Sequence, residues 1–272
     1  MKLACDLYEG PKRVLFVVIE DEKNLFDQTF LEVELWENWN IPVVRASLKQ
    51  INENGEIGEN GELRYKGLEI SLVYFRSGYI PDHYPSSSEW SARELIEISK
   101  AIKCPNIDFH ISGCKKIQQC LSQDMSLFID SSSELSENTT EIYDFSSISP
   151  ELEERVRQNP HDWVLKPQRE GGGNNTYGPD ILPVLDKHEG LKDFILMKMI
   201  KCKENDSFMV RQGVLKKMRT VSEVGMFGLI VGRGDEILVN EYSGYLIRTK
   251  SKESNEGGVA AGYAVIDSAS LI

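Results

Sequence analysis

The chain has 272 residues, of which 31 are Lys or Arg and 43 are Asp or Glu, so its formal net charge is −12. Hydrophobic residues make up 40% and charged residues 27%, proportions typical of a globular protein with one large domain or two smaller ones. The acidic balance argues against nucleic acid as a partner, because binding to a phosphate backbone rests on Lys and Arg. A small anionic ligand needs only a few local cations and is not excluded.

No segment approaches the roughly 20 consecutive apolar residues of a membrane helix, and the charged first twelve residues contain no secretory apolar core. We therefore expect no association with a membrane. The five cysteines are scattered without a C-x-x-C pair, which favours reduced thiols over a zinc site or a disulfide framework. Together these features predict a cytoplasmic protein.

The first half of the chain is predicted to alternate strands and helices. Residues 14–19 and 72–75 are apolar, β-branched runs typical of buried strands, and 43–44 is a short strand between them. Apolar residues recur at helical spacing over 25–39, and a capping box precedes a second amphipathic helix over 90–103. Strand, helix and strand in this order predict an α/β domain with a parallel sheet.

The second half has a different pattern. A Ser-, Thr- and Glu-rich stretch over 131–150 indicates a solvated connection and is the best candidate for an internal boundary. Strands are predicted over 163–166 and 194–200. Residues 207–250 alternate short β-branched runs with glycine turns at 213, 232–234 and 244, which predicts an antiparallel sheet.

The most informative segment runs from Lys166 to Asn175 and contains Gly171, Gly172 and Gly173. Consecutive glycines let backbone N–H groups approach a polyphosphate closely, and the strand-end lysine adds a cation. Glu170 is a hard oxygen ligand of the kind that holds Mg²⁺ together with nucleotide phosphates. No Lys-Ser or Lys-Thr follows the glycines, so the segment is not a Walker A loop. A flexible surface turn remains the alternative.

Two further segments are candidates for ligand contacts. Arg76, Ser77, Gly78 and Tyr79 follow a strand, where open α/β sheets place ligands, although a tight turn with an anchored tyrosine fits equally well. Near the C-terminal end, Arg248-Thr249-Lys250 precedes a glycine-rich stretch and could bind a carboxylate. Two solvated cations beside a loop remain the alternative there.

Two single charged residues complete the set of candidates. Glu223 is a carboxylate within a predicted strand, where it could accept hydrogen bonds from a nucleotide or face water from an edge strand. Lys115, near a predicted helix start, could contact phosphate, although solvated lysines are more common. The four histidines lack ligand spacing, and no catalytic nucleophile is predicted.

These motifs, in this order, resemble those of the eukaryotic-type glutathione synthetases, which are ATP-grasp ligases. The resemblance runs from about Leu7 to Asp267 and is strongest over 24–28, 74–79, 166–175, 248–250 and 257–262. It implies an α/β fold with a parallel-sheet substrate-binding domain over residues 8–112. The C-terminal part of an ATP-grasp domain, an ATP-binding α+β domain with a glycine-rich lid, is then expected over 113–272.

The resemblance also implies an activity. Family members join γ-glutamylcysteine to glycine in an ATP- and Mg²⁺-dependent reaction through an acyl-phosphate, giving glutathione, ADP and phosphate, and a homodimer is implied as well. Family members are longer, and the chain is expected to lack their N-terminal portion, which carries further Mg²⁺ ligands. A truncated, non-catalytic ligand-binding or regulatory form is therefore the alternative, and a ligase with another amine acceptor is a third interpretation.

Carried over residue by residue, the resemblance assigns the site. The implied catalytic residues are Lys166, Arg248 and Lys250, and the implied metal ligand is Glu170. ATP would contact Lys115, Lys166, Glu170, Gly171, Gly172, Gly173, Asn174, Asn175, Tyr177, Met197, Lys198, Met199, Ile200, Glu223, Lys250 and Glu256. The dipeptide and glycine would contact Glu22, Lys23, Asn24, Gln28, Arg76, Ser77, Gly78, Tyr79, Arg248, Val259 and Ala260. Ser77, Lys198 and Glu256 depart from the family, which has acidic residues at the first two positions and Asp at the third.

Overall fold

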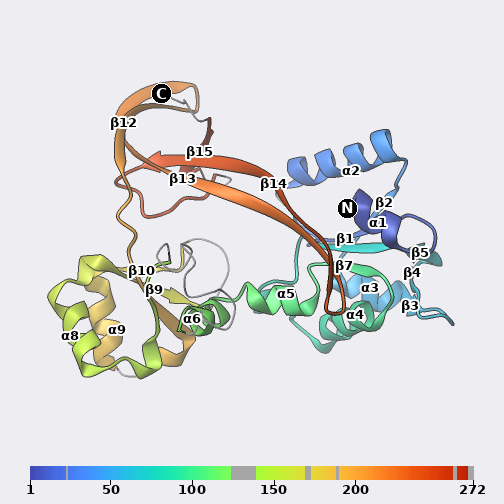
Figure 1. Cartoon of the computed structure of the whole chain (residues 1–272), viewed down its shortest axis with the longest axis horizontal. Coiled ribbons are helices and arrows are strands. Elements are labelled where there is room, and N and C mark those ends of the chain that lie inside the picture. Colours follow the sequence, from blue (N-terminus) through green and yellow to red (C-terminus); the bar gives the residue numbers. More distant parts are fainter. Residues whose placement is uncertain (23, 124–138, 169–172, 188–189, 260–261, 269–272) are drawn as a thin grey trace. The chain divides into compact units, whose positions relative to one another are not determined.

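The computed structural model describes residues 1–22, 24–123, 139–168, 173–187, 190–259 and 262–268 (Figure 1). The chain divides into two compact units, an N-terminal unit, Met1–Ile117, and a C-terminal unit, Gln118–Ile272. No described helix is both long and apolar enough to cross a membrane.

A four-stranded parallel sheet lies at the centre of the N-terminal unit. Its strands, in spatial order, are β2 (Val43–Ala46), β1 (Val14–Val17), β6 (Leu72–Phe75) and β7 (Ile102–Cys104). The predicted parallel α/β sheet is thereby confirmed. The helices are α1 (Lys2–Leu7), α2 (Leu25–Trp39), α3 (Leu48–Asn54), α4 (Ser87–Ile98), α5 (Ile107–Ser112) and the start of α6 (Lys115–Gln123). A small antiparallel sheet is formed by β3 (Gly55–Ile57), β4 (Leu63–Tyr65) and β5 (Leu68–Ile70).

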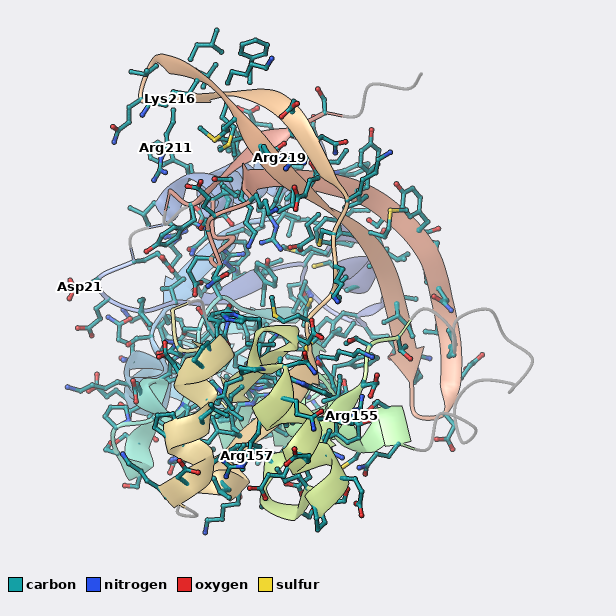
Figure 2. All side chains as sticks on the ribbon, turned by 90° about the vertical axis from the view of Figure 1, so that its left-hand side faces the viewer. Asp21, Arg155, Arg157, Arg211, Lys216 and Arg219 are labelled. Carbon is teal, nitrogen blue, oxygen red and sulfur yellow. The ribbon has the colours of Figure 1, made fainter. Side chains whose placement is uncertain are left out.

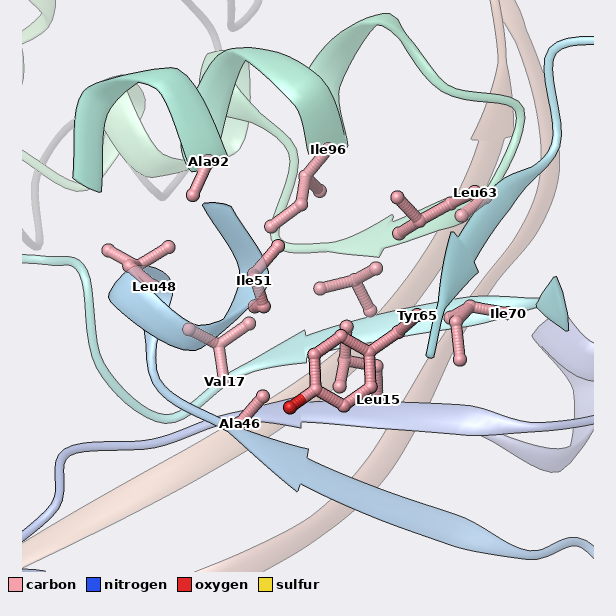
Figure 3. Close-up of a cluster of buried hydrophobic side chains, with 12 residues drawn as sticks. Leu15, Val17, Ala46, Leu48, Ile51, Leu63, Tyr65, Ile70, Ala92 and Ile96 are labelled. Atoms are coloured by element: carbon pink, nitrogen blue, oxygen red, sulfur yellow. The ribbon is translucent and has the colours of Figure 1, made fainter. Parts of the chain in front are cut away.

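The apolar run of β1 is continuous because both faces of the parallel sheet are covered. Leu15 and Val17 point into one cluster with Ile51 of α3 and Ile96 of α4 (Figure 3). Val14 and Phe16, at the alternate positions, join a second cluster that includes Leu35 of α2, Leu72 and Ile41. Alternating side chains of one strand therefore belong to two different cores, as expected for a strand buried on both faces.

Helix α2 has the predicted bounds, but much of its apolar stripe is not buried. Only Leu35 and the polar Gln28 are buried in this helix. Phe26 is 80% exposed and Phe30 is 75% exposed. Helical spacing reports which side chains share a face, but not whether another element covers that face.

Two predictions of local structure are wrong. The helix expected over 90–103 ends at Ile98, and Ile102 instead pairs with Leu72 in the parallel sheet. The solvated connection expected over 131–150 contains strand β8 (Ile142–Asp144), which pairs with β11 (Phe194–Lys198). In both cases, tertiary strand pairing overrides the local pattern.

The C-terminal unit contains two antiparallel sheets. The first has the order β10 (Thr176–Tyr177), β9 (Trp163–Pro167), β11 and β8. Helices α8 (Pro150–Gln158) and α9 (Ile181–Lys187) pack on it through Val156, Ile181 and Leu185. Figure 2 labels Arg155 and Arg157 on α8; Arg157 pairs with Asp186 of α9 at 2.8 Å. Strand β11 ends at Lys198, two residues earlier than predicted.

The second sheet has the order β12 (Glu204–Arg211), β13 (Val214–Arg233), β14 (Glu236–Ser251) and β15 (Ala264–Asp267). This confirms the antiparallel sheet predicted over 207–250. Gly213 and Gly234 occupy turns with positive φ, as expected. Gly244 lies inside β14 instead of at a turn. The register between β13 and β14 shifts beside it, between Phe227 and Gly228, which indicates a bulge.

Candidate functional site

The first candidate site lies at the carboxyl ends of β1 and β6, within the N-terminal unit. These parallel strands are neighbours, and the chain runs from β1 through α2 to β2 on one side before β6 takes the other side. Such a topological switch point is where open α/β sheets bind ligands. Glu22, Asn24 and Gln28 follow β1, and Arg76 to Tyr79 follow β6. Lys23 lies outside the described residues.

The residues after β1 form one hydrogen-bonded network. Glu22 Oε1 accepts from the Asn24 N–H at 2.8 Å, and Glu22 Oε2 accepts from Gln28 Nε2 at 2.8 Å. Arg45 of β2 donates from Nη2 to Gln28 Oε1 at 2.7 Å and pairs with Glu32. Gln28 is completely buried. One Glu22 oxygen is therefore held by the backbone of Asn24 and the other by the buried Gln28 side chain.

Arg76 crosses from the end of β6 to helix α2. Its Nη2 donates to Asp27 Oδ2 at 2.6 Å, and its Nη1 donates to the Tyr74 hydroxyl at 3.3 Å. Burial works to lower the pKa of Arg76, but the Tyr74 hydrogen bond and the charges of Asp27 and Glu22 outweigh it, so the pKa is raised. Arg76 therefore keeps its positive charge at this strand end.

Gly78 is held on both sides by the 3-10 turn Pro81–His83 and the residue after it. Its N–H donates to His83 Nδ1 at 2.8 Å, and its carbonyl accepts from the Tyr84 hydroxyl at 2.8 Å. The backbone φ of +89° favours glycine, and an added Cβ would lie 3.0 Å from the Tyr84 oxygen. Ser77 is buried, whereas Tyr79 is 49% exposed beside the His83 ring.

Sequence reasoning missed three participants in this cluster. Asp27 lies between the assigned residues Asn24 and Gln28, and its acidic side chain in the first turn of α2 could have indicated it. Nothing in the sequence marked Arg45 or His83 as part of a site, because a single arginine in a strand and an isolated histidine are both common. Only the fold brings them beside Gln28 and Gly78.

The second candidate site, in the C-terminal unit, joins the end of the glycine-rich segment to residues 255–256. The Gly173 N–H donates to Glu256 Oε2 at 3.0 Å. Asn175 Nδ2 donates to the Tyr177 hydroxyl at 3.0 Å, and that hydroxyl donates to the Asn255 carbonyl at 3.4 Å. Burial raises the pKa of Tyr177, with the charge of Glu256 adding to the effect, so the phenol stays a donor at neutral pH.

Lys166 and Asn174 lie before and after the three glycines in the sequence. Lys166 lies on β9 in register with Ile195 of β11. Each of the two also makes an interaction within the protein. Glu170, Gly171 and Gly172, which were assigned to magnesium and ATP, lie outside the described residues.

Strands β13 and β14 bring together two residues that were assigned to different ligands. Glu223 and Arg248 are registered partners, and their side chains form an ion pair. Lys250 is in register with Val221 on one side and Ala264 on the other. Val259 accepts at its carbonyl from the Gly262 N–H at 2.9 Å, and Ala260 lies outside the described residues.

The expected adenine segment, Met197 to Ile200, spans the end of strand β11, which stops at Lys198. Lys198 forms an ion pair with Glu141, which also accepts from the Tyr143 hydroxyl at 2.6 Å. These contacts lower the pKa of Glu141 to about 2. Glu141 therefore neutralises the positive charge of Lys198, which stands where the family has an acidic residue. Lys115 begins α6 within the N-terminal unit.

Among the described residues, no group of three or more His, Cys, Asp or Glu side chains is arranged to hold a metal ion. Oxygen donors nonetheless lie at the glycine segment, where Glu256 meets Gly173. A magnesium ion there would need to take further oxygen ligands from a nucleotide, which is its common mode of binding.

Comparison with known proteins adds to this geometry. A family model described as eukaryotic glutathione synthase, ATP binding domain, matches residues 1–271. The chain is 42% identical to the chloroplastic glutathione synthetase of Arabidopsis thaliana, 40% to the Dictyostelium discoideum enzyme and 37% to the human one. These alignments cover 97%, 98% and 97% of the chain but only 51%, 60% and 58% of the relatives.

Among solved structures, a glutathione synthetase-like effector of Globodera pallida in its apo form has the same fold. The TM-score is 0.68 at 16% sequence identity, over 95% of this chain and 56% of that one. The chain thus spans about half to three-fifths of the length of these three relatives and of this structure.

Proposed function

Because the chain belongs to the eukaryotic glutathione synthetase family, we propose that it takes part in ATP-dependent ligation of γ-glutamylcysteine and glycine. In this reaction the dipeptide's C-terminal carboxylate attacks the γ-phosphorus of ATP, and ADP leaves. The glycine amine then attacks the acyl carbon, phosphate leaves, and the amide bond of glutathione remains.

One observation carries the proposal. Residues 83 positions apart meet where the Gly173 N–H donates to Glu256, so two separate motifs of the expected nucleotide site converge. Such convergence is not expected of two unrelated surface loops, each of which would satisfy its polar groups with water.

The proposed roles follow from charge. Arg76 binds a carboxylate of the dipeptide at the switch point. Glu22, which is held by Gln28, binds the amino group of the dipeptide. Lys166 and Lys250 oppose the negative charge that grows on the phosphoryl oxygens, and Arg248 lies at the acceptor end. Magnesium, held by nucleotide phosphates with Glu170 and Glu256 as candidate ligands, supplies further charge neutralisation. Val259 and Ala260 would line the glycine pocket.

The experiment is a coupled assay of the purified chain with ATP, Mg²⁺, γ-glutamylcysteine and glycine. We expect ADP release only when both amino substrates are present. Replacing glycine by β-alanine tests the acceptor, because a closely fitted pocket discriminates against one added carbon by about 10-fold or more. Absence of turnover from a folded chain would reject catalysis by this chain alone.

A non-catalytic ligand-binding or regulatory form is the second candidate, and the observation that favours it is the chain's coverage of only 51–60% of the three relatives compared above. Calorimetry that detects ATP or dipeptide binding without turnover would support this function. Failure to bind either ligand would exclude it.

A homodimer and a cytoplasmic location are part of the same proposal. Sedimentation of the purified chain tests the first and imaging of a fluorescent fusion tests the second. The plant relatives are named as chloroplastic, so plastid signal would overturn the cytoplasmic assignment.

A further inference from the structure

An ion pair at the switch point involves a residue that neither the motif assignments nor the comparisons single out. Asp27, in the first turn of α2, accepts at Oδ2 from Arg76 Nη2 at 2.6 Å, across 49 positions of sequence. The Asp27 side chain is 44% exposed and the Arg76 side chain is 24% exposed. The contact therefore lies at the edge of the site, where a ligand has access to the guanidinium.

The remaining atoms of the pair are unusual. Asp27 Oδ1 and Arg76 Nε are buried and have no hydrogen-bond partner among the described residues. Nε and Nη2 form one edge of a guanidinium, and a carboxylate that faces this edge accepts from both nitrogens at once. One bond of such a fork, from Nη2 to Oδ2, is made here, and the other two atoms that a fork would use are the two without a partner.

The orientation of Arg76 follows from these contacts. Asp27 accepts from Nη2, while the Tyr74 hydroxyl accepts from Nη1. A guanidinium has five N–H groups, so one on Nη1 and one on Nη2 take part in neither bond. These two N–H groups are the candidates for binding a second carboxylate.

We propose that Asp27 is the positioning residue of Arg76, holding its guanidinium so that the remaining N–H groups of Nη1 and Nη2 bind a carboxylate of the substrate. The inference rests on the proposed function, in which that carboxylate belongs to γ-glutamylcysteine. Asp27 does not touch the substrate. It acts by fixing the plane of the Arg76 side chain and so determines how tightly the carboxylate is bound.

A purely structural role, in which the pair ties α2 to β6, makes a different prediction. Loss of a structural tie would lower the stability of the N-terminal unit and affect every ligand of that unit without regard to Arg76. Loss of positioning would change the affinity for the dipeptide only while Arg76 is present.

The test uses the full chain with Asp27→Asn, Asp27→Glu and a matched control, Glu37→Gln, an exposed carboxylate on the same helix. Calorimetry with γ-glutamylcysteine should show affinity at least about 10-fold weaker for Asp27→Asn, partial recovery for Asp27→Glu and no change for the control. If the chain turns over, KM for the dipeptide should rise with less change in kcat. ATP affinity should stay within about twofold in all variants.

A double-mutant cycle separates positioning from a structural tie. In an Arg76→Gln background, Asp27→Asn should weaken dipeptide binding by less than about twofold. An equal effect of Asp27→Asn in both backgrounds would overturn the proposal, as would wild-type affinity in the Asp27→Asn single variant.

A readout without ligand keeps this inference distinct from the proposed function. The Arg76 Nη2–H resonance, whose nitrogen donates to Asp27, should exchange faster with water in Asp27→Asn than in Glu37→Gln when observed by ¹⁵N NMR. If wild-type protein binds no dipeptide, the proposed function fails while this measurement still decides the positioning. An unchanged Nη2–H signal in a folded Asp27→Asn variant would reject it.

Discussion

Glu223 of β13 and Arg248 of β14 face each other as registered cross-strand partners and form an ion pair. The glutamate was assigned to the nucleotide and the arginine to the acceptor end, so the structure links two proposed ligand contacts directly. The side chains are 63% and 39% exposed. Exposed pairs of this kind are weak, and a ligand can take over either partner at little cost.

We therefore expect Glu223→Gln to change the free energy of unfolding by less than about 1 kcal/mol. Urea denaturation of the C-terminal unit measures this. Nucleotide affinity should fall if Glu223 contacts ATP. A stability loss well above that limit would indicate that the pair is structural.

We expect an added methyl group at Gly78 to lower the free energy of unfolding. Gly78→Ala places a Cβ at φ +89° and 3.0 Å from the Tyr84 oxygen, which would disturb the Tyr84 hydrogen bond to the Gly78 carbonyl. Gly67 is a matched control, because its φ is +75° and nothing lies within 4 Å. We expect backbone strain of about 1–2 kcal/mol in both variants and about 0.5–1.5 kcal/mol more in Gly78→Ala. Equal losses in urea unfolding would show that the Tyr84 contact contributes nothing.

The bond from Gly78 to His83 depends on pH. His83 Nδ1 accepts the Gly78 N–H, which requires this nitrogen to be unprotonated. Burial lowers the pKa of His83 below 6.5, against the opposing charges of Asp82 and Glu22. The folded state thus binds fewer protons than the unfolded state. The stability that neutral His83 contributes is present above pH 6.5 and is lost as the pH falls through the lowered pKa.

Denaturation at about pH 5 and about pH 8 measures the effect, and His83→Gln provides the comparison. The glutamine carbonyl can accept the same bond without titrating, so the variant should show a smaller difference between the two pH values. An unchanged difference would assign the pH dependence to other groups.

The ion pair between Lys198 and Glu141 should affect stability at acid pH. Lys198 is the first cause of the lowered pKa of Glu141, which falls from 4.5 to about 2, and Tyr143 and Arg155 add to the shift. Lys198→Gln should raise this pKa partway back. The lowered pKa of Glu141 stabilises the folded state above pH 4.5, and this contribution is lost as the pH falls toward about 2. The variant should therefore lose less stability than the wild type over that pH range. Carbon-detected NMR titration of Glu141 is the measurement, and Lys201→Gln, whose lysine pairs with Asp162 at 3.2 Å, is the control.

The junction at Tyr177 should affect nucleotide binding. Tyr177→Phe removes the hydroxyl that joins Asn175 to the Asn255 carbonyl. Losing about 1 kcal/mol of hydrogen bonding would weaken binding of Mg-ATP by about fivefold. Calorimetry should find no such loss in Tyr242→Phe, which removes an exposed hydroxyl from β14. Wild-type affinity in Tyr177→Phe would contradict a role for this junction.

The sequence was informative where one strand or one turn determines the outcome. Continuous apolar runs predicted the parallel sheet, because strands covered on both faces have no polar side. The capping box before α4 is formed by Ser86 and Glu89 as the pattern indicates, since it depends on only four residues. The predicted ends of α4 and β11 were less accurate, because these ends depend on pairing between strands that are distant in the sequence.

The contacts within the candidate sites depend on tertiary structure that no local pattern records. Arg45 meets Gln28 only because β2 lies beside β1, and Asp27 meets Arg76 only because β6 lies on the other side. The pair Glu223 and Arg248 depends on the register of two long strands.

That register is sensitive to chain length. Side chains alternate across a strand, so a shift of one position would turn every side chain of β14 to the opposite face. The irregularities beside Gly228 and Gly232 already absorb the existing mismatch between the two strands. A single-codon deletion between Gly234 and Arg248 would therefore reverse the side on which the guanidinium is presented while leaving the amino-acid composition nearly unchanged.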